Sequence, residues 1–233
     1  MRLTGGRLAG RVIQIPKGPR IRPTQDQIRQ ALFNLLGESV EGARVLDLFA
    51  GSGALGIEAL SRGAAQVTFV DESRFCARAI EANLRSLGLP AGRGSYREGA
   101  GPVPCSDSPR PLTEQTKYRG GVCGTARGIR PGPLPTPAAR VIQSEVGKAI
   151  QKLARGIDSF DLVFLDPPYG LGLATKALIE LARCAIVSPA GSVVAEADKR
   201  DPLPPEVGTE TTRLVLQRIE RYGDTALAFY QRQ

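Results

Sequence analysis

The sequence predicts an α/β fold of the Rossmann-like type, with a mostly parallel sheet and helices on both of its faces. Two stretches carry this prediction. Residues 43–60 pass from an apolar run through a glycine-rich turn to apolar residues at helical spacing. Residues 160–170 form a second apolar run that ends abruptly in Asp-Pro-Pro-Tyr-Gly. Strands that alternate with helices along the chain are typical of doubly wound parallel sheets.

The first stretch contains three glycines, Gly51, Gly53 and Gly56, in the pattern of the dinucleotide-binding fingerprint. Glycine at these positions lets the backbone turn tightly and approach a ligand closely. The turn ends where a helix begins, so its N–H groups are expected to point at whatever binds there. A glycine cluster without any ligand is the structural alternative.

Two aspartates accompany this turn. Asp71 follows another apolar run about twenty residues after the glycines. A carboxylate there can accept two ribose hydroxyls of either NAD or S-adenosylmethionine (SAM), with Glu72 as the alternative ligand. Asp47 lies inside the first strand, where a carboxylate would meet a cation better than a pyrophosphate. Asp47 therefore favours SAM, which carries an ammonium and a sulfonium group and no phosphate.

The second stretch ends in Asp166, Pro167, Pro168 and Tyr169. Two prolines cannot continue a sheet ladder, so they hold Asp166 at the carboxyl end of its strand, the edge where open α/β sheets bind ligands. Methylation of a nucleobase amino group needs acceptors for the N–H protons and a base held in position. Asp166 and the Pro167 carbonyl can supply acceptors, and Tyr169 can stack on the base. An ordinary strand-ending turn is the structural alternative.

With both motifs, the chain resembles the amino-directed, SAM-dependent methyltransferases, which methylate exocyclic nitrogens of nucleobases. The closer resemblance is to the RsmD family, bacterial methyltransferases of guanine N2 in 16S ribosomal RNA. It covers residues 1 to about 90 and about 139 to 233. The residues that carry it are Gly5, Gly6, Arg11, Arg22, Pro23, Thr24, Asp26, Arg29, Leu32, Phe33, Asn34, the run from Asp47 to Arg62, Tyr222 and Gly223.

The resemblance implies a seven-stranded sheet with one antiparallel strand and the transfer of a methyl group from SAM to a guanine N2 in 16S rRNA. It also implies that Glu145, where the family carries Asp or Asn, accepts the adenine amino group of the cofactor. The expected partner is 16S rRNA or the assembling small ribosomal subunit, and the expected state is a cytoplasmic monomer. The expected cofactor-binding residues are Asp47, Gly51, Gly53, Asp71 and Glu145, and the expected catalytic residues are Asp166, Pro167 and Tyr169.

Positive charge is concentrated in two parts of the chain. The net charge of the 233 residues is +8 and the pI is about 9.7. Residues 1–40 carry +5 and residues 91–138 carry +4, so the rest of the chain is nearly neutral. Such clustering is typical of proteins that bind a polyanion, because each neutralised phosphate releases counterions. A solvated basic face is the alternative for each segment.

We therefore expect two parts. Residues 1–36 form a basic N-terminal extension, a hairpin followed by a helix capped by Thr24, with Arg7, Arg11, Arg22 and Arg29 as the predicted RNA contacts. Residues 37–233 form the methyltransferase domain. An insertion at 91–138 interrupts it and holds nine Gly and eight Pro among few aliphatic residues. Such a composition predicts a disordered or loosely attached segment, because little apolar surface can be buried.

The sequence contains no histidine, and its four cysteines form no C-x-x-C pair. No zinc site is expected, and Ser-His and Cys-His mechanisms are excluded. No secretory signal and no apolar run near about 18 residues is present, so we expect reduced thiols, a cytoplasmic location and no membrane contact.

Three alternatives stay open. A methyltransferase of amino groups in DNA or another RNA could share both motifs, although the Arg-Pro-Thr segment at residues 22–24 speaks against it. An NAD-dependent oxidoreductase would share the glycine fingerprint but leaves Asp47 and the Asp-Pro-Pro-Tyr motif unexplained. A non-catalytic RNA-binding assembly factor would need neither motif intact.

Overall fold

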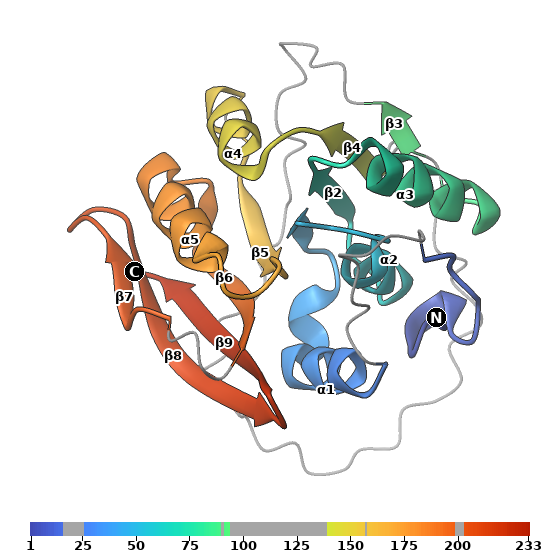
Figure 1. The fold of residues 1–233 in the computed structure, drawn as a ribbon, viewed down its shortest axis with the longest axis horizontal. Helices are drawn as coiled ribbons and strands as arrows, with labels where there is room; N and C mark the ends of the chain where they lie inside the picture. The colour runs from blue at the N-terminus through green and yellow to red at the C-terminus, as the bar shows by residue number, and fades with distance from the viewer. Residues whose placement is uncertain (16–25, 90, 94–138, 157, 199–202) are drawn as a thin grey trace, which may run out of the picture.

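The computed structural model describes residues 1–15, 26–89, 91–93, 139–156, 158–198 and 203–233 (Figure 1). Within them one sheet of nine strands runs through the molecule. The strands are β1 (Arg44–Leu48), β2 (Gln66–Asp71), β3 (Ala91–Arg93), β4 (Ala139–Gln143), β5 (Phe160–Leu165), β6 (Val187–Asp198), β7 (Glu206–Gly208), β8 (Arg213–Tyr222) and β9 (Thr225–Arg232). Their order across the sheet is β3-β4-β2-β1-β5-β6-β9-β8-β7.

Helices cover both faces of the sheet, as predicted. They are α1 (Asp26–Leu36), α2 (Ala54–Ser61), α3 (Arg74–Ser86), α4 (Val146–Arg155) and α5 (Leu173–Cys184), with 3-10 turns at Gly6–Leu8 and Gly37–Val40. Successive side chains of a strand point to opposite faces. Val45 of β1 accordingly joins the apolar core under α1, α2 and α3, whereas Leu46 joins the core under α4 and α5. Figure 1 shows these two helical layers on either side of the strands.

The predicted strand count was wrong. The described residues form nine strands where seven were expected, with five parallel pairings and three antiparallel ones, the latter joining β6, β9, β8 and β7. The two short edge strands, β3 and β7, account for the difference. Three residues are too few to show an alternating pattern, and such strands form because a neighbouring edge offers unpaired backbone groups.

β3 also moves one predicted boundary. Residues 91–93 were assigned to the insertion, yet they pair in parallel with Ala139 to Val141 of β4 at the edge of the sheet. The remainder of the predicted insertion, residues 94–138, lies outside the described residues, as do Arg22 and the predicted capping residue Thr24.

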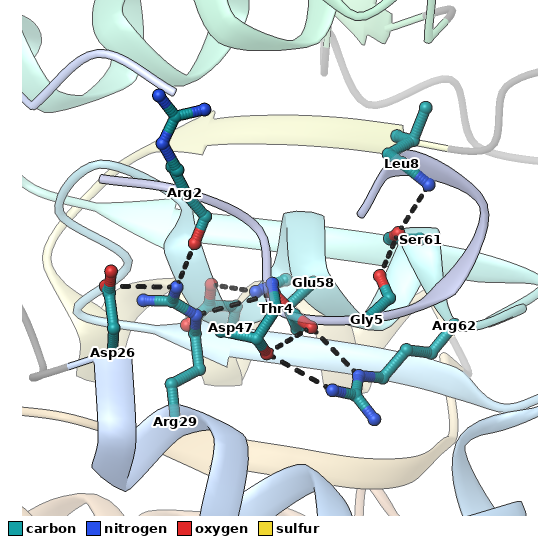
Figure 2. A network of polar contacts seen from close by, with 11 residues as sticks. Arg2, Thr4, Gly5, Leu8, Asp26, Arg29, Asp47, Glu58, Ser61 and Arg62 are labelled. Atoms are coloured by element: carbon teal, nitrogen blue, oxygen red, sulfur yellow. Dashed lines mark hydrogen bonds and ion pairs between the residues drawn. The ribbon is translucent and has the colours of Figure 1, made fainter. Parts of the chain in front are cut away.

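Residues 1–15 pack against α2 and α3 through specific polar contacts. The backbone N–H and the hydroxyl of Thr4 each donate to the Glu58 carboxylate at 2.8 Å. The Ser61 hydroxyl accepts from the Leu8 N–H at 2.9 Å and donates to the Gly5 carbonyl at 2.6 Å. Figure 2 shows these contacts converging on α2. The N-terminal residues are therefore fastened to the helix that follows the glycine turn.

α1 joins the same network through Arg29, whose side chain is 0% exposed. Its Nε atom lies 3.4 Å from Glu58, which is also 0% exposed, and its Nη2 atom donates to the Arg2 carbonyl and to Asp26. Arg62 completes the network with a 2.9 Å bond to Glu58 (Figure 2). The prediction that Arg29 contacts RNA was therefore wrong. The N-terminal residues cover this side of α1, a long-range contact that helical periodicity does not reveal.

Replacing Glu58 with glutamine is expected to lower the free energy of unfolding by about 3–5 kcal/mol, because the buried Arg29 guanidinium loses its buried carboxylate partner and keeps only the 54% exposed Asp26. Urea denaturation of the wild type and of Glu58→Gln measures this. The matched control is Glu206→Gln on β7, where a solvent-exposed pair with Arg213 at 3.8 Å should change the same quantity by less than about 0.5 kcal/mol. Equal effects of the two substitutions would contradict the role given to the network.

Candidate active site

A cleft of about 2090 Å³ opens at the carboxyl ends of the parallel strands. A single ligand of ordinary size needs about 300–1,000 Å³, so this space can hold a cofactor and a second molecule side by side. Among the predicted cofactor-binding and catalytic residues, Gly53 is the one outside the cleft wall. The predicted residues that line the cleft are Asp47, Gly51, Asp71, Glu145, Asp166, Pro167 and Tyr169.

The three glycines of the fingerprint serve two different purposes. Gly51 and Gly53 have φ angles of 55° and 78°, the left-handed region in which a side chain is strained. Gly56 is helical, but a Cβ atom there would lie 2.3 Å from the ring of Phe69 on β2. The first two glycines therefore shape the turn, and the third lets α2 pack closely on the sheet.

Asp71, at the end of β2, holds the glycine turn in the free protein. Its Oδ2 atom accepts a 2.8 Å hydrogen bond from the Gly51 N–H, and its Oδ1 atom accepts one of 2.8 Å from the Ser73 N–H. Each carboxylate oxygen has a second lone pair, so the group can still accept hydroxyl donors from the cleft. The predicted ribose ligand is thus also a structural element of the turn.

Asp47 is nearly fully buried and accepts a 2.9 Å hydrogen bond from the Gly56 N–H. Burial raises the pKa of Asp47 to about 7, with a further contribution from the nearby charge of Asp71, and the bond from Gly56 opposes the shift only in part. A carboxylate in this environment gains from a cation beside it. The structure therefore gives Asp47 the electrostatic surroundings that its predicted role requires.

Phe49 follows the first strand directly and has an unusual backbone conformation. β1 ends at Leu48, and Phe49 has a φ angle of 61°, which is rare for a bulky residue. Its half-buried side chain lines the cleft. Such backbone strain concentrates at ligand sites. The hydrophobic pattern of the sequence does not reveal this backbone conformation, because a phenylalanine directly after a strand fits the pattern of one more strand residue.

Tyr169 is fixed by a residue that the sequence analysis did not include among the site residues. Its hydroxyl donates to Oε1 of Glu196 on β6 at 2.5 Å, and Thr225 Oγ1 of β9 lies 3.5 Å away. Burial and the bond to Glu196 raise the pKa of Tyr169 far above its ordinary value, so the phenol stays neutral. Burial also raises the pKa of Glu196. The ring is therefore held against the cleft wall, as a stacking platform needs.

The remaining predicted residues lie at the rim or on the surface. Glu145, at the N-terminus of α4, is exposed and pairs with Lys148 at 3.0 Å. Arg7 is exposed, and exposed Arg11 donates to the Ser86 carbonyl at 3.0 Å. The cleft rim also carries Phe75, which is 78% exposed and which the sequence analysis did not single out. An exposed aromatic ring at a helix start has no periodic pattern that would reveal it.

The parallel sheet, the glycine turn and the Asp-Pro-Pro-Tyr strand end define a SAM-dependent methyltransferase of the Rossmann-like class. The chain belongs to the RsmD family, because the family described as "Conserved hypothetical protein 95" matches residues 1–100 and 134–231. Among the described residues, no helix combines the length and the apolar character needed to cross a membrane.

Individual proteins agree with this assignment. "Ribosomal RNA small subunit methyltransferase D" of Escherichia coli (strain K12) is 29% identical over 233 residues, 100% of this chain and 90% of that protein. YlbH of Bacillus subtilis (strain 168) is 30% identical over 233 residues, which span 100% of both chains. The solved structure of yhhF from Escherichia coli has a TM-score of 0.69 and 27% identity, covering 100% of this chain and 98% of that one.

The raised pKa of Asp47 predicts a pH-dependent stability. Its folded-state pKa of about 7 exceeds the ordinary value of 3.8, so protonated Asp47 stabilises the fold at low pH, and this contribution is lost as the pH rises from about 4 through 7. Relative to Asp47→Asn, the free energy of unfolding of the wild type should fall by at most about 4 kcal/mol over that range and level off above it.

Urea denaturation of both proteins between pH 5 and 8 measures the difference. The chain has no histidine, so no ordinary imidazole titration obscures this window. A difference between the two proteins that stays constant from pH 5 to 8 would show that Asp47 is already ionised in the fold.

Proposed function

We propose that the protein transfers a methyl group from SAM to the exocyclic N2 amino group of a guanine in 16S ribosomal RNA. The observation that carries this is the position of β5 directly beside β1, with Leu165 paired to Leu48. The glycine turn after β1 and the Asp-Pro-Pro-Tyr motif after β5 consequently open into one cleft. A methyl donor and an amino group bound at these two strand ends would be neighbours.

The chemistry of the cleft residues suits SAM. Asp47 offers a buried carboxylate whose charge a cation would stabilise, and SAM carries two positive groups. Asp71 retains lone pairs for the ribose hydroxyls, and Glu145 at the rim is assigned to the adenine amino group by family resemblance. Gly51 and Gly53 let the turn approach the ligand. When bound, SAM supplies an electrophilic methyl group on sulfur.

Asp166, Pro167 and Tyr169 orient the base. The Asp166 carboxylate and the Pro167 carbonyl accept the N–H protons of the amino group, which directs the nitrogen lone pair toward the methyl group. Tyr169 stacks on a guanine that is unpaired or flipped out. Asp166 then receives the proton that the nitrogen loses. Alignment of the amine nitrogen with the methyl group and the sulfur supplies most of the rate acceleration. The reaction therefore needs no imidazole base, and the chain contains no histidine.

We assign the RNA contacts to a basic N-terminal extension, residues 1–36, attached to the methyltransferase domain at 37–233. Arg7 and Arg11 are exposed there, and the similar Escherichia coli protein is named for small-subunit ribosomal RNA. The net charge of +8 fits a polyanionic partner. The substrate is thus 16S rRNA or the assembling small subunit, methylated by a cytoplasmic monomer.

The proposal is tested by incubating the protein and labelled SAM with small subunits, and separately with free 16S rRNA, from cells lacking this modification. Nucleoside mass spectrometry should find N2-methylguanosine, and sequencing of RNA fragments maps its position. Asp166→Asn should lower kcat by about 10²–10³-fold with unchanged SAM affinity, because the neutral amide cannot stabilise the positive charge that develops on the amine or receive its proton. Glu206→Gln on β7 is the surface control. A methylated adenine or cytosine instead would assign the protein to another amino methyltransferase.

Cofactor binding is tested by calorimetric titration with SAM and, separately, with NAD. Asp71→Ala should weaken SAM binding at least tenfold, because it removes the acceptor for the ribose hydroxyls and the bond that holds Gly51. Binding of NAD without binding of SAM would favour the oxidoreductase. If neither SAM nor NAD binds, the result would favour the non-catalytic assembly factor.

A further inference from the structure

Glu196 lies beside Asp166 on the neighbouring strand. β5 and β6 are parallel, with Phe164 paired to Val194 and Leu165 paired to Ala195. Asp166 and Glu196 come one position beyond the last pair, and adjacent strands are about 4.8 Å apart. Both residues line the cleft. Two carboxylates therefore stand next to each other at the part of the cleft assigned above to the base.

The Glu196 carboxylate is held in place and can still accept further hydrogen bonds. The residue is 7% exposed, and the Tyr169 hydroxyl donates to its Oε1 atom at 2.5 Å. An ionised carboxylate has about four lone-pair sites, so this bond leaves acceptor capacity on both oxygens. The same bond ties Glu196 to the ring proposed to stack on the base. A stacked base would thus have a fixed acceptor at its edge.

The three nucleobases that carry an exocyclic amino group differ in the atom beside it. In adenine and in cytosine, the amino group and an unprotonated ring nitrogen share the Watson–Crick edge, and that nitrogen is an acceptor. In guanine, the N2 amino group stands beside N1–H, which is a donor. A second carboxylate next to the one that binds the amino group attracts guanine N1–H and repels the lone pair of adenine or cytosine.

We propose that Glu196 accepts a hydrogen bond from N1–H of the target base and thereby selects guanine, while Tyr169 holds the carboxylate in position. This inference rests on the proposed function and deepens it, because it assigns the choice of base to a residue of this chain. Asp166 binds the reacting amino group, and Glu196 reads the atom beside it.

The test compares three purines that all carry the N2 amino group. Small-subunit RNA is ligated from segments with guanine, 6-thioguanine or 2-aminopurine at the nucleotide mapped above. 6-Thioguanine retains N1–H, whereas N1 of 2-aminopurine is an acceptor. For the wild type, kcat/KM with 6-thioguanine should stay within about threefold of guanine, and kcat/KM with 2-aminopurine should be about ten- to a hundredfold lower.

Glu196→Gln should reduce the guanine to 2-aminopurine ratio to below about threefold, because an amide can accept from N1–H or donate to an unprotonated N1. Tyr169→Phe keeps the ring but frees the carboxylate, so the ratio should fall to a value between those of the wild type and Glu196→Gln. Glu206→Gln should leave the ratio unchanged. The SAM affinity measured by calorimetry reports whether each variant is folded. If Glu196 had a purely structural role, its substitution would lower kcat/KM for all three purines together.

The outcomes separate the two proposals. If the wild type methylates no guanine, the proposed function fails. If it methylates guanine and 2-aminopurine equally, or if Glu196→Gln keeps the full ratio, the function stands and the role of Glu196 is refuted. If Glu196→Gln does not fold, the wild-type ratio and Tyr169→Phe decide.

Discussion

Two carboxylates hold the glycine turn at the centre of this molecule. Asp47 accepts a hydrogen bond from the Gly56 N–H, and Asp71, on the adjacent strand, accepts one from the Gly51 N–H. The turn is thereby fixed at both ends by groups that also face the cleft. Because negative charge shapes the turn, the site is suited to a positively charged ligand and poorly suited to a phosphate. The two carboxylates that fold the loop are therefore also the groups that favour a cationic cofactor.

The order of strands then determines what can meet in the cleft. β5 follows β1 by more than a hundred residues in the chain but lies directly beside it, and β6 lies beside β5. The carboxyl ends of β1, β5 and β6 therefore present the glycine turn, the Asp-Pro-Pro-Tyr motif and Glu196 in sequence along one edge. Antiparallel β9 adds Thr225 to the same wall. Residues that lie far apart in the sequence are thus brought within a few strand spacings of one another.

Local sequence patterns predicted the parts of the site that depend on residues close to one another in the chain. The glycine turn, Asp47, Asp71 and the Asp-Pro-Pro-Tyr motif lie in or directly after strands that hydrophobic periodicity reveals. All of them except Gly53 and Gly56 line the cleft. Burial of Arg29 and the contact between Tyr169 and Glu196 depend on elements far apart in the chain, so no window of sequence contains them. The short strands β3 and β7 likewise exist because a neighbouring edge is available.

The fastening of the first fifteen residues to α2 and α3 affects how the chain acquires its structure during synthesis. Thr4 finds its partner Glu58 only 54 residues later, and Gln14 bonds to Asn83, 69 residues further on. Synthesis runs from the N-terminus, so these residues are made before their partners on α2 and α3. Their docking must nevertheless wait until α3 has emerged. Until then, Arg2, Arg7 and Arg11 belong to a segment that has no folded helix to pack on.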